Sequence, residues 1–145
     1  MMPSPFDHYP VAIEAKESDY LYTGISGIKN AGNGLFTAIP IFPNEIIAVF
    51  QGRILSEEEI TDKIFHRLDA YFINMPDGTT LDCMDSKCFA GFANDAHGHS
   101  RHHRPNNAII ALNEGGDVCL VATRKIPTGA EIFCGYGRQY WKKHT

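Results

Sequence analysis

Glycine and proline recur along the whole chain, and they limit how long any regular element can be. The 145 residues include 13 glycines and 8 prolines, and no repeat or low-complexity block separates them. Because both residue types interrupt helices and favour turns, this spread predicts many short strands rather than long helices. The length suits a single domain. We therefore expect a mainly β domain.

The local pattern of apolar residues places the expected strands and turns. Two hairpins are predicted, one around the Met-Pro-Asp-Gly turn at residues 75–78 and one around the Asn-Glu-Gly-Gly turn at residues 113–116. Gly115 and Gly116 can both adopt positive φ in the second turn. The segments expected to be extended are residues 20–24, 34–38, 45–50, 71–74, 79–81, 108–112 and 118–122.

One convincing helix is predicted, beginning at Ser56. Glu59 stands three residues after Ser56, which is the spacing of a capping box. Ile60, Ile64 and Leu68 follow at intervals of four residues, so they are expected to share one face of this helix.

Composition and charge exclude several classes of protein. Lys and Arg number 13 against 17 Asp and Glu, a net charge of −4, which argues against sequence-independent binding of nucleic acid. There is no apolar run of about 18 residues that would span a membrane. Three prolines and an aspartate within the first ten residues are incompatible with the apolar core of a secretory signal. We therefore expect an intracellular protein, in the cytoplasm or the nucleus, with no nucleic-acid or membrane partner.

The cysteines are expected to be reduced. Cys83, Cys88, Cys119 and Cys134 form no C-x-x-C or C-x-C pair, so a four-thiolate zinc site is not expected. An even number is compatible with two disulfides. Without an export signal, however, four thiols that are mostly buried as small apolar groups are the simpler expectation.

A long polar segment covers residues 94–107 and is interpreted as an ordered loop or a binding loop. It contains four histidines, His97, His99, His102 and His103. Imidazoles at this density are typical of zinc or nickel binding, and a metal-sensing β domain is one hypothesis. Flexible neighbours and the shortage of Cys or carboxylate ligands favour a solvated loop instead, and no metal is expected.

Three short features each have a structural and a functional interpretation. Gly32, Asn33 and Gly34 form a G-x-G sequence that lacks the third glycine of a dinucleotide site, so it marks either a tight turn or a close approach of backbone to a ligand. Asn94 ends an apolar run, and its amide bonds either to loop backbone or to a ligand. Tyr136 lies between two glycines and is either a core tyrosine or a residue whose hydroxyl lies in a narrow passage.

Four segments in order resemble the SET-domain family of protein-lysine methyltransferases, and together they span roughly residues 20–141. The fourth is the most specific. The segments are NAGNGLFTA at 30–38 (the family's opening G-x-G strand), YFI at 71–73 with LDC at 81–83 (its central hairpin), GFANDA at 91–96 with PNN at 105–107 (its R-F-I-N-H-S and P-N-C), and ATRKIPTGAEIFCGYG at 122–137 (its A-x-R-x-I-x-x-G-E-E-L-x-x-x-Y-G).

The resemblance implies a particular fold. A SET domain is a β-clip fold of short strands with one short helix, and its C-terminal stretch threads beneath the preceding loop as a pseudoknot. Residues 1–145 would form one such domain, with residues 1–19 as an N-terminal lead segment and residues 20–141 as its core.

The resemblance also implies a reaction and a site. S-adenosylmethionine would be the methyl donor and a protein with an exposed lysine the substrate; histone tails are the family's common target. The lysine would enter from the face opposite the donor, through a channel lined by Tyr71 and Cys134, with Tyr136 and Tyr71 as catalytic residues. Cys134 is smaller than the Tyr or Phe of the family, so we expect room for di- or trimethylation. The donor would lie against Gly32, Asn33, Gly34, Asn94, Asp95, Tyr136 and Trp141.

The chain also departs from the family pattern. Gly91, Asp95 and Ala96 stand where the family has Arg, His and Ser, and no cysteine cluster follows Trp141. A non-catalytic module that binds the donor or a peptide is therefore the alternative to an active methyltransferase. Small free-standing members can complete the site by dimerising, so the resemblance also allows a homodimer.

Overall fold

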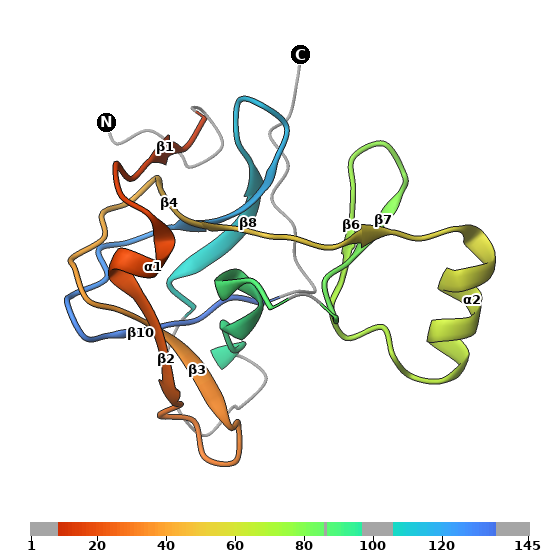
Figure 1. Ribbon diagram of the computed structural model, residues 1–145, viewed down its shortest axis with the longest axis horizontal. Coiled ribbons are helices and arrows are strands. Elements are labelled where there is room, and N and C mark those ends of the chain that lie inside the picture. The colour runs from red at the N-terminus through yellow and green to blue at the C-terminus, as the bar shows by residue number, and fades with distance from the viewer. Residues whose placement is uncertain (1–8, 86, 97–105, 136–145) are drawn as a thin grey trace.

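The computed structural model describes residues 9–85, 87–96 and 106–135. Within these residues the chain forms ten short strands and three short helical segments, which confirms the expected mainly β fold (Figure 1). The helical segments are α1 (Glu17–Tyr20), α2 (Glu57–Phe65) and the 3-10 helix η1 (Phe89–Phe92). The strands are β1 (Val11–Ala12), β2 (Leu21–Ile25), β3 (Asn33–Thr37), β4 (Glu45–Val49), β5 (Arg53–Ile54), β6 (Phe72–Asn74), β7 (Thr80–Asp82), β8 (Ala108–Leu112), β9 (Val118–Ala122) and β10 (Glu131–Ile132).

The strands are arranged in three sheets. A four-stranded sheet has the order β1-β4-β9-β8, and two three-stranded sheets have the orders β10-β3-β2 and β5-β7-β6. Strand β9 is buried along its whole length. Ile110 and Leu120 face each other across β8 and β9 and are both fully buried, so this pair lies in the centre of the main hydrophobic core.

The expected strands are present to within one residue at either end. Both predicted hairpins form, and their turns contain Gly78 at φ 88° and Gly116 at φ 86°. Gly115 does not adopt positive φ, so that part of the expectation is wrong. Of the two glycines, Gly116 takes the left-handed position of the turn, and its backbone N–H donates to the carbonyl of Asn113.

The N-terminal lead segment is part of the fold, which the sequence pattern did not predict. Strand β1 pairs in parallel with β4, and Val11 lies opposite Glu45. The carboxylate of Glu17, in α1, accepts a hydrogen bond from the backbone N–H of Val49 at 3.1 Å. Both contacts hold the lead segment against the edge of the four-stranded sheet.

Helix α2 begins as predicted and ends earlier than the apolar pattern suggested. Ser56 and Glu59 form the reciprocal capping box. The helix ends at Phe65, and Arg67 adopts φ 59°, a left-handed conformation that stops the helix before Leu68. Leu68 therefore lies outside the helix, which corrects the expected apolar face. With β6 and β7, α2 forms one end of the molecule (Figure 1).

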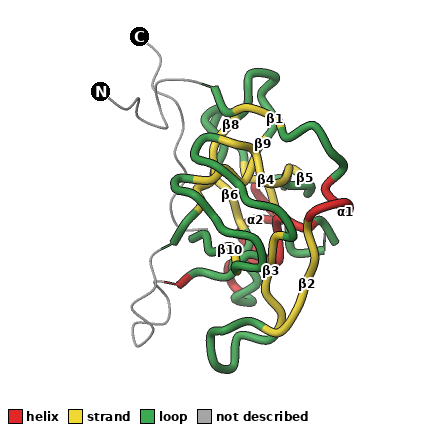
Figure 2. The backbone as a smooth tube through the Cα atoms, turned by 90° about the vertical axis from the view of Figure 1, so that its left-hand side faces the viewer, coloured by secondary structure: helices red, strands yellow, loops and turns green. Residues whose placement is uncertain are grey.

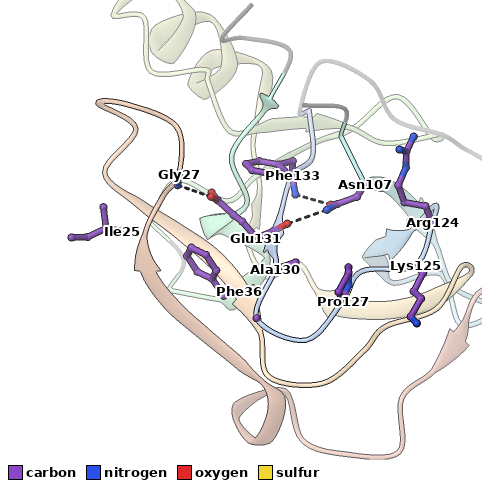
Figure 3. A pocket seen from close by; sticks show the side chains of 11 residues that line it. Ile25, Gly27, Phe36, Asn107, Arg124, Lys125, Pro127, Ala130, Glu131 and Phe133 are labelled. Atoms are coloured by element: carbon purple, nitrogen blue, oxygen red, sulfur yellow. Dashed lines mark hydrogen bonds between the residues drawn. The ribbon is translucent and has the colours of Figure 1, made fainter. Parts of the chain in front are cut away.

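Three segments that are distant in sequence meet where the C-terminal strand ends. β10 pairs with β3, and Phe133 then forms a parallel bridge with Asn94. The side chain of Asn107 donates to the carbonyl of Glu131 at 3.0 Å and accepts from the N–H of Phe133 at 2.8 Å (Figure 3). These are contacts that a C-terminal pseudoknot requires, although residues 97–105 of the intervening loop lie outside the described residues.

The hairpin of β2 and β3 extends away from the four-stranded sheet and ends in the loop that carries Gly32 (Figure 2). Helix η1 packs against β2, β3 and β4. This packing brings the residues that follow η1 next to the start of β3, where the candidate site lies.

Candidate functional site

A cavity of about 310 Å³ collects residues from three of the segments that the sequence singled out. Asn33 comes from the G-x-G strand, Tyr71 from the start of the β6–β7 hairpin, and Asn94 from the segment after η1. The volume is at the lower end of the range for pockets that bind small organic molecules. The other lining residues are Ala31, Cys83, Met84, Cys88, Gly91 and Phe92.

A larger hollow, of about 550 Å³, lies elsewhere and contains none of the predicted site residues. Phe36 and Pro127 give it an apolar wall, and Arg124 and Lys125 add two cationic side chains (Figure 3). Because Asn33, Tyr71 and Asn94 converge on the smaller cavity, the smaller cavity is the candidate site.

The G-x-G sequence forms the tight turn that was one of its two interpretations, and the approach of its backbone to a ligand stays a prediction. Gly32 has φ 73°, and its carbonyl accepts a hydrogen bond from Ser26 at 2.9 Å, which closes the loop between β2 and β3. Gly34 is buried, and a Cβ at this position would overlap the carboxylate of Glu131. The second glycine is thus needed because a side chain lies directly against the backbone of β3.

The amide of Asn94 connects the G-x-G strand to β10. Its Nδ2 donates to the carbonyl of Asn33 at 3.1 Å and to Oε2 of Glu131 at 3.4 Å. Both partners only accept hydrogen bonds, so the orientation of the amide is assigned by them. No described residue donates to Oδ1 of Asn94, which leaves an acceptor at the wall of the cavity.

Asp95 is held in the loop network on the far side of Asn94. Its Oδ1 accepts from Nδ2 of Asn106 at 3.0 Å, and Oδ1 of Asn106 accepts from the backbone N–H of Ala96 at 2.9 Å. A Cβ on Gly135 would lie 2.9 Å from Oδ2 of Asp95. Asp95 therefore ties together the segments on either side of residues 97–105, and the structure does not place it on the lining of the cavity.

The two residues expected to line the lysine channel lie in different surroundings. Tyr71 is 37% exposed and borders the cavity. Cys134 is 1% exposed, belongs to the main core cluster, and donates its backbone N–H to the carbonyl of Asn94 at 2.8 Å. Cys134 is not among the described residues that line the cavity bordered by Tyr71, and the shared lysine channel stays a prediction.

A protein-family model described as the SET domain matches residues 32–137, which is most of the chain. The protein belongs to the SET-domain family. The match includes the G-x-G strand from Gly32 onward, the central hairpin, the segment around Asn94 and the C-terminal signature, so it reaches all four segments that carried the resemblance. A comparison with curated proteins gave no match.

Solved structures confirm the fold of this SET domain. One is an apo form of Polycomb Repressive Complex 2 (ctPRC2) with two substitutions in Ezh2, at a TM-score of 0.65 and 22% identity, covering 81% of this chain and 15% of that chain. Another is Chaetomium thermophilum Polycomb Repressive Complex 2 bound to GSK126, at a TM-score of 0.66 and 21% identity, covering 81% and 16%. A humanized mutant of the same complex bound to the inhibitor GSK343 has a TM-score of 0.64 and 22% identity, covering 81% and 15%. The chain therefore corresponds to a small part of these proteins.

Several sequence-predicted residues of the SET domain fall outside the described residues. These are Tyr136, Trp141 and the histidines His97, His99, His102 and His103. The expected roles of Tyr136 and Trp141 in catalysis and donor binding stay predictions, and so does the solvated loop expected for the histidines. In residues 9–85, 87–96 and 106–135, no group of three or more His, Cys, Asp or Glu residues is arranged to hold a metal ion. None of the described helices has the length and apolar character needed to cross a membrane.

Sequence reasoning missed two features of the site. One is Glu131, a buried acid that bonds to Asn94. The other is the sulfur-containing wall of the cavity, formed by Cys83, Met84 and Cys88. Glu131 stands in the C-terminal signature at 122–137, but nothing local identifies its partners, and the sulfur-containing residues have no local signal. The partners of Glu131 and the neighbours of the sulfur atoms come together only when the chain folds. All four cysteines are free and three are buried, which confirms the expected reduced thiols.

The cysteines of this SET domain are expected to differ sharply in reactivity. Burial raises the pKa of Cys83, Cys119 and Cys134 to about 12, with smaller contributions from nearby acidic groups or thiols. The thiolate is the reactive form, and a thiol with this pKa is about one part in ten thousand ionised at pH 8. Native protein treated with iodoacetamide should therefore be labelled at Cys88 alone, as read by peptide mass spectrometry.

Unfolded protein provides the control for this experiment, because all four thiols should then be labelled. Labelling of Cys83 at the same rate as Cys88 in native protein would contradict the burial that the structure shows. Since Cys88 lines the cavity, a ligand bound there should slow its labelling.

Proposed function

We propose that the protein is an S-adenosylmethionine-dependent N-methyltransferase that acts on a lysine side chain of a protein substrate. Membership of the SET-domain family supports a methyltransferase of this class. The observation that carries the proposal is the convergence of Asn33, Tyr71 and Asn94 on one cavity. These residues come from three separate segments, and each segment was expected from the resemblance to contribute to the donor site or the lysine channel.

The residues at the cavity fit an amino-acid ligand. Oδ1 of Asn94 is an acceptor that no described residue satisfies, and an ammonium group is a suitable donor for it. Phe92 and Met84 add apolar surface beside this polar group. The bound donor would supply a methyl group activated by an adjacent sulfonium. Gly32, Asn33, Gly34 and Asn94 would hold its amino-acid end, with Asp95 acting through the loop that it braces.

The lysine must reach the donor in its neutral form. Its ordinary pKa is about 10.4, and a shift of about three units, roughly 4 kcal/mol, would be needed to bring it near 7.5. A channel that excludes water and a cationic donor both disfavour a second positive charge and so lower this pKa. Tyr136, with an ordinary pKa near 10, is a poor base at neutral pH. Its proposed role, shared with Tyr71, is to orient the amine for in-line attack.

The direct test is methyl transfer. Protein incubated with radiolabelled S-adenosylmethionine and lysine-bearing proteins should transfer label to lysine, with histone tails included among the substrates. Mass spectrometry of a host lysate treated in the same way would identify the modified lysines. Transfer to no substrate, together with normal binding of S-adenosylhomocysteine, would favour the second candidate function.

That second candidate is a non-catalytic module that binds the donor or a peptide. It is favoured by one observation, the use of Asp95 in a position where the family has His, because this carboxylate is engaged with Asn106 rather than placed at the cavity. Binding without turnover is the result that distinguishes the module from the enzyme.

Replacing Asn94 with alanine is expected to weaken the binding of S-adenosylhomocysteine by about 1–3 kcal/mol, because a buried polar contact to the ligand is lost. The variant also removes the link between Asn33 and Glu131. Isothermal titration calorimetry measures the effect. Asn113→Ala, in the β8–β9 turn, is the matched control and should leave the affinity unchanged. Equal affinities for the two variants would contradict the proposed donor site.

Replacing Cys134 with tyrosine is expected to shift the products on a peptide lysine from di- and trimethylated to monomethylated forms. The larger ring would occupy space that successive methyl groups require. Because Cys134 is 1% exposed, overpacking of about 1–3 kcal/mol is also expected, and the melting temperature is measured in parallel. An unchanged product distribution in a folded variant would show that Cys134 does not limit the channel.

A further inference from the structure

Glu131 is a buried acid whose carboxylate accepts from three donors among the described residues. It is 7% exposed and lies at the start of β10. Its carboxylate accepts from Oγ of Ser26 at 2.6 Å, from the backbone N–H of Gly27 at 2.8 Å, and from Nδ2 of Asn94 at 3.4 Å (the Gly27 bond is drawn in Figure 3). A carboxylate is the side chain that suits this position, because it presents acceptors only.

Two of these bonds shape the loop between β2 and β3. Ser26 donates to Glu131 and accepts through Oγ from the N–H of Ile28 at 3.1 Å. The backbone N–H of Ser26 bonds to the carbonyl of Gly32 at 2.9 Å. The Glu131 carboxylate therefore fixes the β2–β3 loop at Ser26, the residue whose backbone bonds to Gly32 of the G-x-G sequence.

The same carboxylate lies directly against β3. Gly34 lacks a side chain where Oε2 of Glu131 sits, and Nδ2 of Asn94 would be 3.3 Å from a Cβ at this position. Oε2 and the carbonyl of Asn33 thus approach Nδ2 of Asn94 together. With Nδ2 held by two acceptors and no described residue bonded to Oδ1, Oδ1 is the atom of the amide that would meet a ligand.

We propose that Glu131 is a positioning residue for the donor site: it orients the amide of Asn94 and holds the loop that carries the G-x-G sequence, without touching the ligand. This inference rests on the proposed function. Glu131 is not among the residues that line the cavity, so its effect on a ligand is transmitted through Asn94 and Gly34.

The test is the nearly isosteric variant Glu131→Gln. A glutamine at this position places an amide NH₂ against at least one of the donors, Gly27 N–H or Asn94 Nδ2, so the orientation of Asn94 is no longer fixed. The expected result is at least about a tenfold rise in the Kd of S-adenosylhomocysteine by titration calorimetry, about 1.4 kcal/mol. The KM for donor should rise, whereas kcat at saturating donor and the KM for peptide should stay within about twofold.

A rise in the KM for donor without a change in kcat distinguishes a positioning role from loss of folded protein. Loss of folded protein would lower the apparent kcat and the fitted binding stoichiometry without raising the KM for donor. Glu45→Gln is the matched control, because Glu45 also accepts a backbone N–H, that of Phe42 at 2.7 Å, but lies on β4. It should bind S-adenosylhomocysteine with wild-type affinity.

A second variant covers the case in which Glu131→Gln does not fold, and hydrogen exchange tests the loop without ligand. If Glu131→Gln does not fold, Ser26→Ala removes one donor from the same carboxylate and should raise the Kd of S-adenosylhomocysteine by a smaller factor. In both variants the Gly27 amide should exchange with deuterium faster than in wild type, with or without ligand. If Glu131→Gln folds and binds S-adenosylhomocysteine with wild-type affinity, the positioning role is overturned. If only Ser26→Ala folds, wild-type affinity in that variant overturns it in the same way. Wild-type protein that does not bind S-adenosylhomocysteine overturns the proposed function, and the positioning role with it.

Discussion

Replacing Gly34 with alanine is expected to abolish binding of S-adenosylhomocysteine and to lower the free energy of unfolding by about 1–3 kcal/mol. The added Cβ would overlap Oε2 of Glu131 and would lie 2.9 Å from Cδ of the same side chain. The carboxylate would have to move away from Ser26 and Asn94, its partners at 2.6 and 3.4 Å. A single methyl group would therefore disturb the loop, the amide and the start of β10 together.

Gly24→Ala is the control for this prediction because Gly24 lies opposite Gly34 in the β2–β3 pair. A Cβ at Gly24 would meet only the ring of Phe36, at 3.4 Å, so stability should change by less than about 1 kcal/mol. Thermal unfolding and titration calorimetry of both variants give the comparison. A Gly34→Ala protein with wild-type stability and affinity would show that the carboxylate does not need to lie against β3.

Replacing Tyr136 with phenylalanine is expected to reduce turnover by at least about a hundredfold while leaving the affinity for S-adenosylhomocysteine nearly unchanged. The expectation rests on the sequence signature that ends in Tyr136 and on the proposed need to align a neutral amine with the methyl group. Removing one hydroxyl removes an oxygen near the positive charge that develops during transfer, but no contact with the donor's amino-acid end. The measurement is single-turnover methyl transfer on a lysine peptide.

Tyr22→Phe is the matched control for the loss of a tyrosine hydroxyl. Tyr22 is 43% exposed on β2, where its ring stacks on Phe36 at 5.6 Å between centroids. Its variant should retain full turnover. If Tyr136→Phe transfers methyl groups as fast as wild type, Tyr136 is not the residue that aligns the amine.

Features with a local cause could be predicted from the sequence. The hairpin turns were found because Gly78 and Gly116 mark them, and the start of α2 was found because Ser56 and Glu59 form a capping box within one turn. The end of α2 was placed too late. Apolar spacing continues to Leu68, whereas the helix stops at Phe65 because Arg67 turns the chain.

Features that depend on distant contacts could not be predicted in the same way. Lys63 of α2 forms an ion pair with the buried Asp82 of β7 at 2.6 Å, although 19 residues separate them. Ser26 and Glu131 are 105 residues apart. Of the candidate site, the resemblance supplied Asn33, Tyr71 and Asn94. Its C-terminal signature also contains Glu131, but only the fold shows that this acid holds the Asn94 amide in place.

The contacts at β10 also determine when the protein can fold during synthesis. One edge of β3 is paired with β2, and the other remains open until β10 arrives. Contacts between residues so distant in sequence form slowly, and an open strand edge can pair with another chain. A nascent chain on the ribosome must therefore wait for residues 131–134 to emerge from the exit tunnel.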